Sequence, residues 1–68
     1  MTQETRTDIE VFPAPYGKDI KLEDVRFEGG MRFLRIRIQE GKRFTTLDLD
    51  ENTARHFGET LARWLEAE

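Results

Sequence analysis

The stretch RFLRIRIQEGKRFTTLDLD, residues 32–50, constrains the fold more strongly than any other part of the chain. Apolar and polar residues alternate on both sides of a short polar break, which is typical of two half-buried strands joined by a turn. With Glu40 and Gly41 as a two-residue loop, paired residue numbers add up to 81. One face then holds the aliphatic set, with Leu34, Ile36 and Ile38 opposite Leu47, Thr45 and Arg43. The other face holds Phe33, Arg35 and Arg37 opposite Asp48, Thr46 and Phe44.

Two further strands are predicted before this hairpin. The segment IEVF, residues 9–12, is followed by PAPYG, and because proline is tolerated mainly at sheet edges, we expect an edge strand there. The segment DIKLEDVRF, residues 19–27, changes the phase of its apolar residues once. A period of two that slips by one residue is typical of a β-bulge, which we expect near Glu23–Asp24.

A C-terminal helix follows. Asp50 is a suitable N-cap, because its side chain can accept a hydrogen bond from the first turn of the helix. The apolar residues beyond it have the spacing of a single helical stripe: Ala54, Phe57, Leu61, Trp64 and Leu65. The sequence therefore predicts an α+β fold, β-β-β-β-α, with one four-stranded antiparallel sheet covered on its aliphatic face by the helix.

Length and composition limit the organisation of the chain. Its 68 residues predict a single domain over 9–68, preceded by a polar leader over 1–8 that we expect to be disordered. The absence of cysteine favours a reducing cytoplasm, and no apolar run is long enough to span a membrane. Because so small a domain buries little apolar area and has no disulfide, we expect it to form a homodimer.

Catalysis and metal binding are poorly supported by the residue types. The chain has no cysteine, no serine and one histidine, His56, which lies away from the apolar stripe. Nucleophile–base pairs and zinc sites need those residues, so we predict neither an enzyme nor a cofactor. Asp48 and Asp50 share one side of a strand, but Asp50 is better suited to capping the helix.

Charge is unevenly distributed, although the net charge of the chain is −3. Residues 26–43 contain six basic and two acidic side chains, while the segments on either side are acidic. Cations beside flat side chains bind the phosphates and bases of single-stranded nucleic acids. The candidate binding residues on this basis are Phe33, Arg35, Arg37, Lys42, Arg43 and Phe44.

Two alternatives to nucleic-acid binding are open. The arginines can simply cover a solvated sheet face, with their stems shielding the two phenylalanines. The same face can also contact another protein, because Arg and Phe are both favoured at interfaces. In either case the domain is a small structural or protein-interaction module with no nucleic-acid ligand.

Several segments together resemble a known family. DIKLEDVRFEGG, RFLRIRIQ, GKRFTTLDLDENTARHF and the terminal helix are similar to the single-stranded-DNA-binding domain of the positive cofactor four family of transcriptional coactivators and its bacterial relatives. The closest correspondences are RIRI, residues 35–38, and LDLDEN, residues 47–52. The resemblance implies a curved four-stranded sheet followed by a helix, and single strands bound across the sheet.

The same resemblance implies a dimer formed through the helices. In this chain that interface would use Phe57, Leu61 and Trp64. It also implies that basic and aromatic groups on the sheet bind the single strand, which points again to Arg35, Arg37, Lys42, Arg43 and Phe44.

Overall fold

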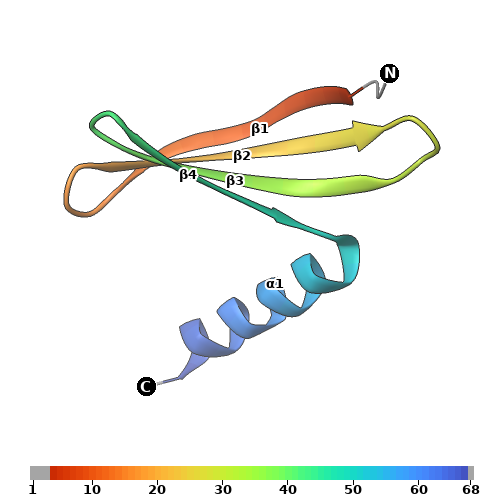
Figure 1. Cartoon of the computed structure of the whole chain (residues 1–68). Coiled ribbons are helices and arrows are strands. Elements are labelled where there is room, and N and C mark those ends of the chain that lie inside the picture. Colours follow the sequence, from red (N-terminus) through yellow and green to blue (C-terminus); the bar gives the residue numbers. More distant parts are fainter. Residues whose placement is uncertain (1–3, 68) are drawn as a thin grey trace.

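The computed structural model describes residues 4–67 and confirms the predicted α+β fold. Four antiparallel strands form one sheet in the order β1-β2-β3-β4, followed by a helix, α1 (Figure 1). Their bounds are β1 Glu4–Ala14, β2 Lys18–Phe27, β3 Arg32–Glu40, β4 Arg43–Leu49 and α1 Glu51–Glu66. Each strand pairs with the next along the chain, so β1, which contains Pro13, lies at an edge as expected.

The β3–β4 hairpin differs from the expected register by two residues. Glu40 pairs with Arg43, so the loop is Gly41–Lys42 and not Glu40–Gly41. Gly41 has a φ of +61°, which suits the first central position of a two-residue type II′ loop. A shift of two leaves each side chain on its expected face but changes its partner, so Arg35 lies opposite Asp48.

The predicted position of the bulge, near Glu23–Asp24 in β2, is wrong, because the bulge lies in β1. β2 pairs with β3 without interruption, and the register shift lies in β1, where Ile9 is the extra residue. β2 instead contributes apolar groups to both faces of the sheet. Its Val25 is fully buried on the side away from the helix.

The leader expected over residues 1–8 is also corrected. β1 begins at Glu4, so residues 4–8 belong to the sheet and pair with β2, while residues 1–3 lie outside the described part of the chain. Residues 4–8 lie in an exposed edge strand, where few apolar groups are needed. Their polar, non-periodic sequence therefore did not indicate a strand.

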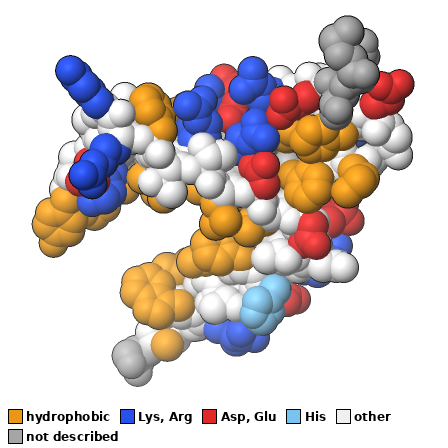
Figure 2. Space-filling view, in the orientation of Figure 1, with side chains coloured by type: hydrophobic (Ala, Val, Ile, Leu, Met, Phe, Trp, Pro, Cys, Tyr) orange, Lys and Arg blue, Asp and Glu red, His pale blue; other side chains and the backbone are white. Residues whose placement is uncertain are grey.

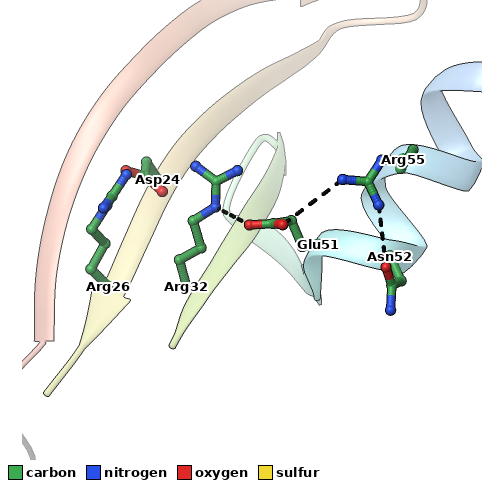
Figure 3. Close-up of polar contacts among 6 residues, drawn as sticks. All are labelled: Asp24, Arg26, Arg32, Glu51, Asn52 and Arg55. Atoms are coloured by element: carbon green, nitrogen blue, oxygen red, sulfur yellow. Dashed lines mark hydrogen bonds and ion pairs between the residues drawn. The ribbon is translucent and has the colours of Figure 1, made fainter. Parts of the chain in front are cut away.

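The helix begins as predicted, with a cap on a very short connection. Asp50 is the single residue between β4 and α1, and its Oδ1 accepts a hydrogen bond of 2.8 Å from the backbone N–H of Thr53. Hydrogen bonds from Thr53 hold the pKa of Asp50 below its ordinary value. The Nε of Arg32 donates to Glu51 Oε1 at 2.7 Å, which ties the start of β3 to the start of α1 (Figure 3).

Little of this chain is buried on its own. The buried apolar side chains of the described residues are Val25 and Ile36. The helix lies on the side of the aliphatic face, as expected, but it contacts β3 and β4 only sparsely and has no buried residue (Figure 1). The radius of gyration is 13.8 Å, whereas a compact chain of this length has roughly 11 Å.

Candidate binding surfaces

The sheet face away from the helix, called the polar face below, carries the arginines singled out from the sequence. Alternation along β2, β3 and β4 places these side chains on it: Asp19, Lys21, Glu23, Val25, Phe33, Arg35, Arg37, Gln39, Phe44, Thr46 and Asp48. The register arranges them in rows across the sheet. One row runs from Glu23 through Arg35 to Asp48, and the next from Lys21 through Arg37 to Thr46.

Arg35 is held between two carboxylates. Its Nε and Nη2 donate to the two oxygens of Asp48 at 2.8 and 3.0 Å, and its Nη1 donates to Glu4 Oε1 at 3.0 Å. The side chain of Arg35 is 17% exposed. A guanidinium that already binds one carboxylate in bidentate fashion and donates to a second has few N–H donors left for a phosphate. Arg35 therefore joins β1, β3 and β4 and is a structural residue of this face.

The clamp shifts the titration of both partners. The hydrogen bonds from Arg35 hold the pKa of Asp48 below its ordinary value, and those to Asp48 raise the pKa of Arg35. Because the pKa of Asp48 is lowered on folding, its contribution to stability is present above the ordinary pKa of an aspartate. That contribution is lost as the pH falls through the lowered value.

Replacing Asp48 with asparagine is expected to reduce the acid sensitivity of the fold. At neutral pH the variant loses about 1 kcal/mol of stability, which lowers the melting temperature by roughly 4–8 °C. As the pH falls through the lowered pKa of Asp48 the two proteins converge, because wild-type Asp48 becomes protonated as well. Thermal unfolding followed by circular dichroism between pH 2 and 7 measures this. Asp19→Asn is the matched control, since Asp19 makes no ion pair within residues 4–67. If the melting temperatures of the two variants depended equally on pH, the ion pair between Asp48 and Arg35 would not contribute as described.

Lys21 is a second paired cation on this face. Its Nζ lies 3.3 Å from Asp8 Oδ1 and 3.7 Å from Glu23 Oε2. Glu23 is buried, and its Oε1 has no hydrogen-bond partner in the described chain. Two cations of the polar face, Arg35 and Lys21, are therefore neutralised locally.

Phe33 also contacts other residues of the sheet. Its ring meets that of Phe27 edge to face, with centroids 5.6 Å apart and planes at 80°. It also lies opposite the fully buried Val25. These three residues form a small apolar cluster on the polar face, so Phe33 stabilises the sheet and does not offer a free ring to a base.

The turn end of the polar face is different. The guanidinium carbon of Arg37 lies 5.2 Å from the ring centroid of Phe44, and Phe44 is 56% exposed. Arg37 makes no ion pair within residues 4–67. A recess of about 180 Å³ opens here, lined by Val11, Asp19, Lys21, Arg37, Gln39 and Phe44. Lys42 lies in the adjacent turn.

Arg43 is separated from this group by the register. It pairs with Glu40, in phase with Ile38 and Ile36, so its side chain projects on the helix side of the sheet. The six residues singled out from the sequence thus divide in the structure. Arg37, Phe44 and Lys42 gather at the turn end, whereas Phe33 and Arg35 are internal to the face and Arg43 lies on the other side.

Four residues of the recess, Val11, Asp19, Lys21 and Gln39, were not singled out from the sequence. Val11, Asp19 and Lys21 reach it because β1 and β2 run beside the β3–β4 hairpin, and Gln39 belongs to β3 itself. Strict alternation in residues 19–27, without the expected bulge, would have placed Asp19 and Lys21 on the same face as Arg37. The position of Val11 depends on the bulge at Ile9, which the sequence did not indicate.

A second surface is apolar. The helix stripe, defined by Ala54, Phe57, Leu61, Trp64 and Leu65, is turned towards the aliphatic face of the sheet but is largely uncovered. Hydrophobic side chains line both sides of an open hollow between sheet and helix (Figure 2). Near the strand–helix connection it includes a recess of about 240 Å³, lined by Leu47, Leu49, Thr53, His56, Phe57 and Thr60.

Neither a metal site nor a membrane-spanning helix is found in the part of the chain that the structure describes. No three His, Asp or Glu side chains of residues 4–67 converge as metal ligands would. The single described helix is not long and apolar enough to cross a bilayer. Asp48 and Asp50, which share one side of a strand in the sequence pattern, both have structural partners. Asp48 binds Arg35, and Asp50 caps the helix.

Comparison with known proteins places the chain in a family. A model described as "Family of unknown function (DUF6967)" matches residues 3–67, nearly the whole length. The chain belongs to this family. No curated protein and no solved structure matches this DUF6967 chain.

Proposed function

We propose that this DUF6967 domain is a non-enzymatic binding module that binds single-stranded nucleic acid at the turn end of the polar face. The observation that carries the proposal is the Arg37–Phe44 pair. It combines an exposed ring with a guanidinium free of carboxylate partners among the described residues. Single strands are bound by such combinations, because every base has a flat face and every nucleotide a phosphate.

In this proposal each residue of the turn end has a role. A base stacks on the exposed part of the Phe44 ring or on the guanidinium plane of Arg37, which already lies against that ring. Lys42 in the turn neutralises a phosphate of the same strand. The Arg35 clamp fixes β3 against β4, so that Arg37 and Phe44, on neighbouring rows, keep their separation.

We also propose that the chain acts as a homodimer through the helix residues Phe57, Leu61 and Trp64. Three large apolar side chains exposed on one stripe are unusual for a small monomeric domain. A dimer of this kind carries two copies of the Arg37–Phe44 pair. A long strand that reaches both copies would bind more tightly than one that reaches a single copy.

A second candidate function is a structural or protein-interaction domain without a nucleic-acid ligand. The Arg35 and Lys21 pairings favour it, because they neutralise two cations of the polar face. A protein partner would then contact the exposed apolar residues, and binding would depend little on salt.

Salt dependence separates the two candidates. A fluorescently labelled oligothymidine, short enough for one site, is titrated with protein between about 50 and 200 mM salt, and anisotropy is recorded. Micromolar binding is expected to weaken with a log–log slope of about −1.4, corresponding to two phosphate contacts by Arg37 and Lys42. No binding at low salt would contradict the proposal. A slope near −2.8 would contradict a site limited to Arg37 and Lys42, because it corresponds to about four phosphate contacts.

A further inference from the structure

The hollow between sheet and helix widens towards the end of α1. Exposure along the helix stripe rises from 44% at Phe57 and 47% at Leu61 to 72% at Trp64 and 74% at Leu65. The opposite wall includes Leu47, which is 54% exposed. Two apolar walls therefore face an open space that no part of residues 4–67 fills (Figure 2).

The chain cannot readily close this hollow by itself. Only Asp50 connects β4 to α1, and its cap fixes the first turn of the helix. The ion pair between Arg32 and Glu51 holds the helix start against β3, and Arg55 braces Glu51 from the next turn at 3.8 Å (Figure 3). Swinging the helix onto its own sheet would have to strain this connection. The occupant is therefore a separate chain.

The exposed area is large enough for a stable dimer. The surface of the chain is 5891 Å², whereas a compact monomer of this mass exposes roughly 4,450 Å². The excess of roughly 1,400 Å² exceeds the ~800 Å² that each partner contributes to a standard interface. A second copy supplies apolar surface of matching extent, because it carries the same two walls.

We infer that the hollow is occupied by the helix of a second copy, so that each helix stripe packs against the aliphatic face of the other chain. A two-fold axis makes the contact reciprocal: the helix stripe of each chain packs against Leu47 and Leu49 of the other chain. This deepens the proposed homodimer by adding the sheet to an interface otherwise made of helix alone. It is independent of whether the polar face binds nucleic acid.

The helix has enough apolar surface to contact two walls. At 100° per residue, Gly58 and Ala62 lie beside the stripe and widen its apolar arc to roughly 160°. A Cβ built on Gly58 meets no atom within 4 Å, so that flank is open to the partner's helix. Arg55, Glu59 and Arg63 lie on the opposite side and remain in water.

The sheet wall provides the test. Leu47→Lys is expected to weaken the dimer at least 30-fold, because it places a charge in the interface, while Thr46→Lys on the polar face of the same strand changes nothing. Sedimentation velocity over a range of concentrations measures this, with wild type at twice the 8.0 kDa of one chain. Leu47 is half exposed in the single chain, so lysine there does not by itself prevent folding.

Cross-linking gives a second readout, since the chain has no cysteine of its own. Leu47→Cys and Leu61→Cys are made as separate chains, mixed and oxidised. The mixed disulfide is expected to predominate over the link between two Leu61→Cys chains. A wild-type monomer at every concentration would overturn both this inference and the homodimer. A dimer insensitive to Leu47→Lys, with links only between Leu61→Cys chains, would overturn this inference alone.

Discussion

Replacing Trp64 with alanine is expected to weaken the homodimer by roughly 100-fold. Trp64 is the largest side chain of the helix stripe and is 72% exposed in the single chain, so most of its burial in the proposed dimer would come from the partner. Its loss is also felt twice in a symmetric dimer. Sedimentation velocity between low and high micromolar protein, together with circular dichroism, follows dissociation and folding at once. Because so little is buried within one chain, dissociation is expected to lower the melting temperature as well.

Arg63→Ala is the control for this variant. Arg63 lies one residue away on the opposite side of the helix, and within residues 4–67 its side chain donates to Thr60 Oγ1 at 3.2 Å. Removing it leaves the stripe intact, so the dimer should be unchanged. A folded Trp64→Ala protein with the dissociation constant of wild type would place the interface elsewhere on the molecule.

The double variant Arg37→Ala/Phe44→Ala is expected to lose on the order of 100-fold in affinity for a short single-stranded oligonucleotide. Loss of a base stack costs ~1–3 kcal/mol, and the loss of one phosphate contact adds to it. The fold should survive, because Phe44 is exposed and Arg37 makes no ion pair within residues 4–67. Anisotropy at low salt measures the affinity, and circular dichroism verifies the fold.

Arg63→Ala is the matched control for charge. Like the double variant, it removes one positive charge, here from the exposed outer side of the helix. If binding depends only on net charge, both variants lose affinity equally. That result would contradict a localised site at Arg37 and Phe44.

The faces of the sheet could be predicted from the sequence, but the partners of individual residues could not. Alternation in residues 32–50 predicts that Arg35 and Arg37 lie on the same face. This holds for both the expected and the observed loop, because the two registers differ by two residues. The register itself depends on Gly41 and its positive φ, and it decides that Arg35 meets Asp48. The third member of that clamp, Glu4, comes from a strand that composition did not indicate.

The helix shows the same division. Its N-cap and apolar stripe follow from local sequence, since capping and helical spacing involve residues only a few positions apart. Its angle to the sheet does not, because that angle depends on a one-residue connection and on an ion pair between Arg32 and Glu51, 19 positions apart. The stripe was therefore expected to cover the chain's own sheet, whereas most of it is exposed.

The central claim is that single-stranded nucleic acid binds at the turn end of the polar face. The most direct test is a titration of ¹⁵N-labelled protein with oligothymidine, followed by two-dimensional ¹H–¹⁵N NMR. Backbone signals of Arg37, Gln39, Lys42 and Phe44 should shift in proportion to saturation, while the Arg35 side-chain Nε–H signal stays in place because its carboxylates retain it. Unchanged spectra at high oligonucleotide concentration, or shifts confined to α1, would contradict the claim.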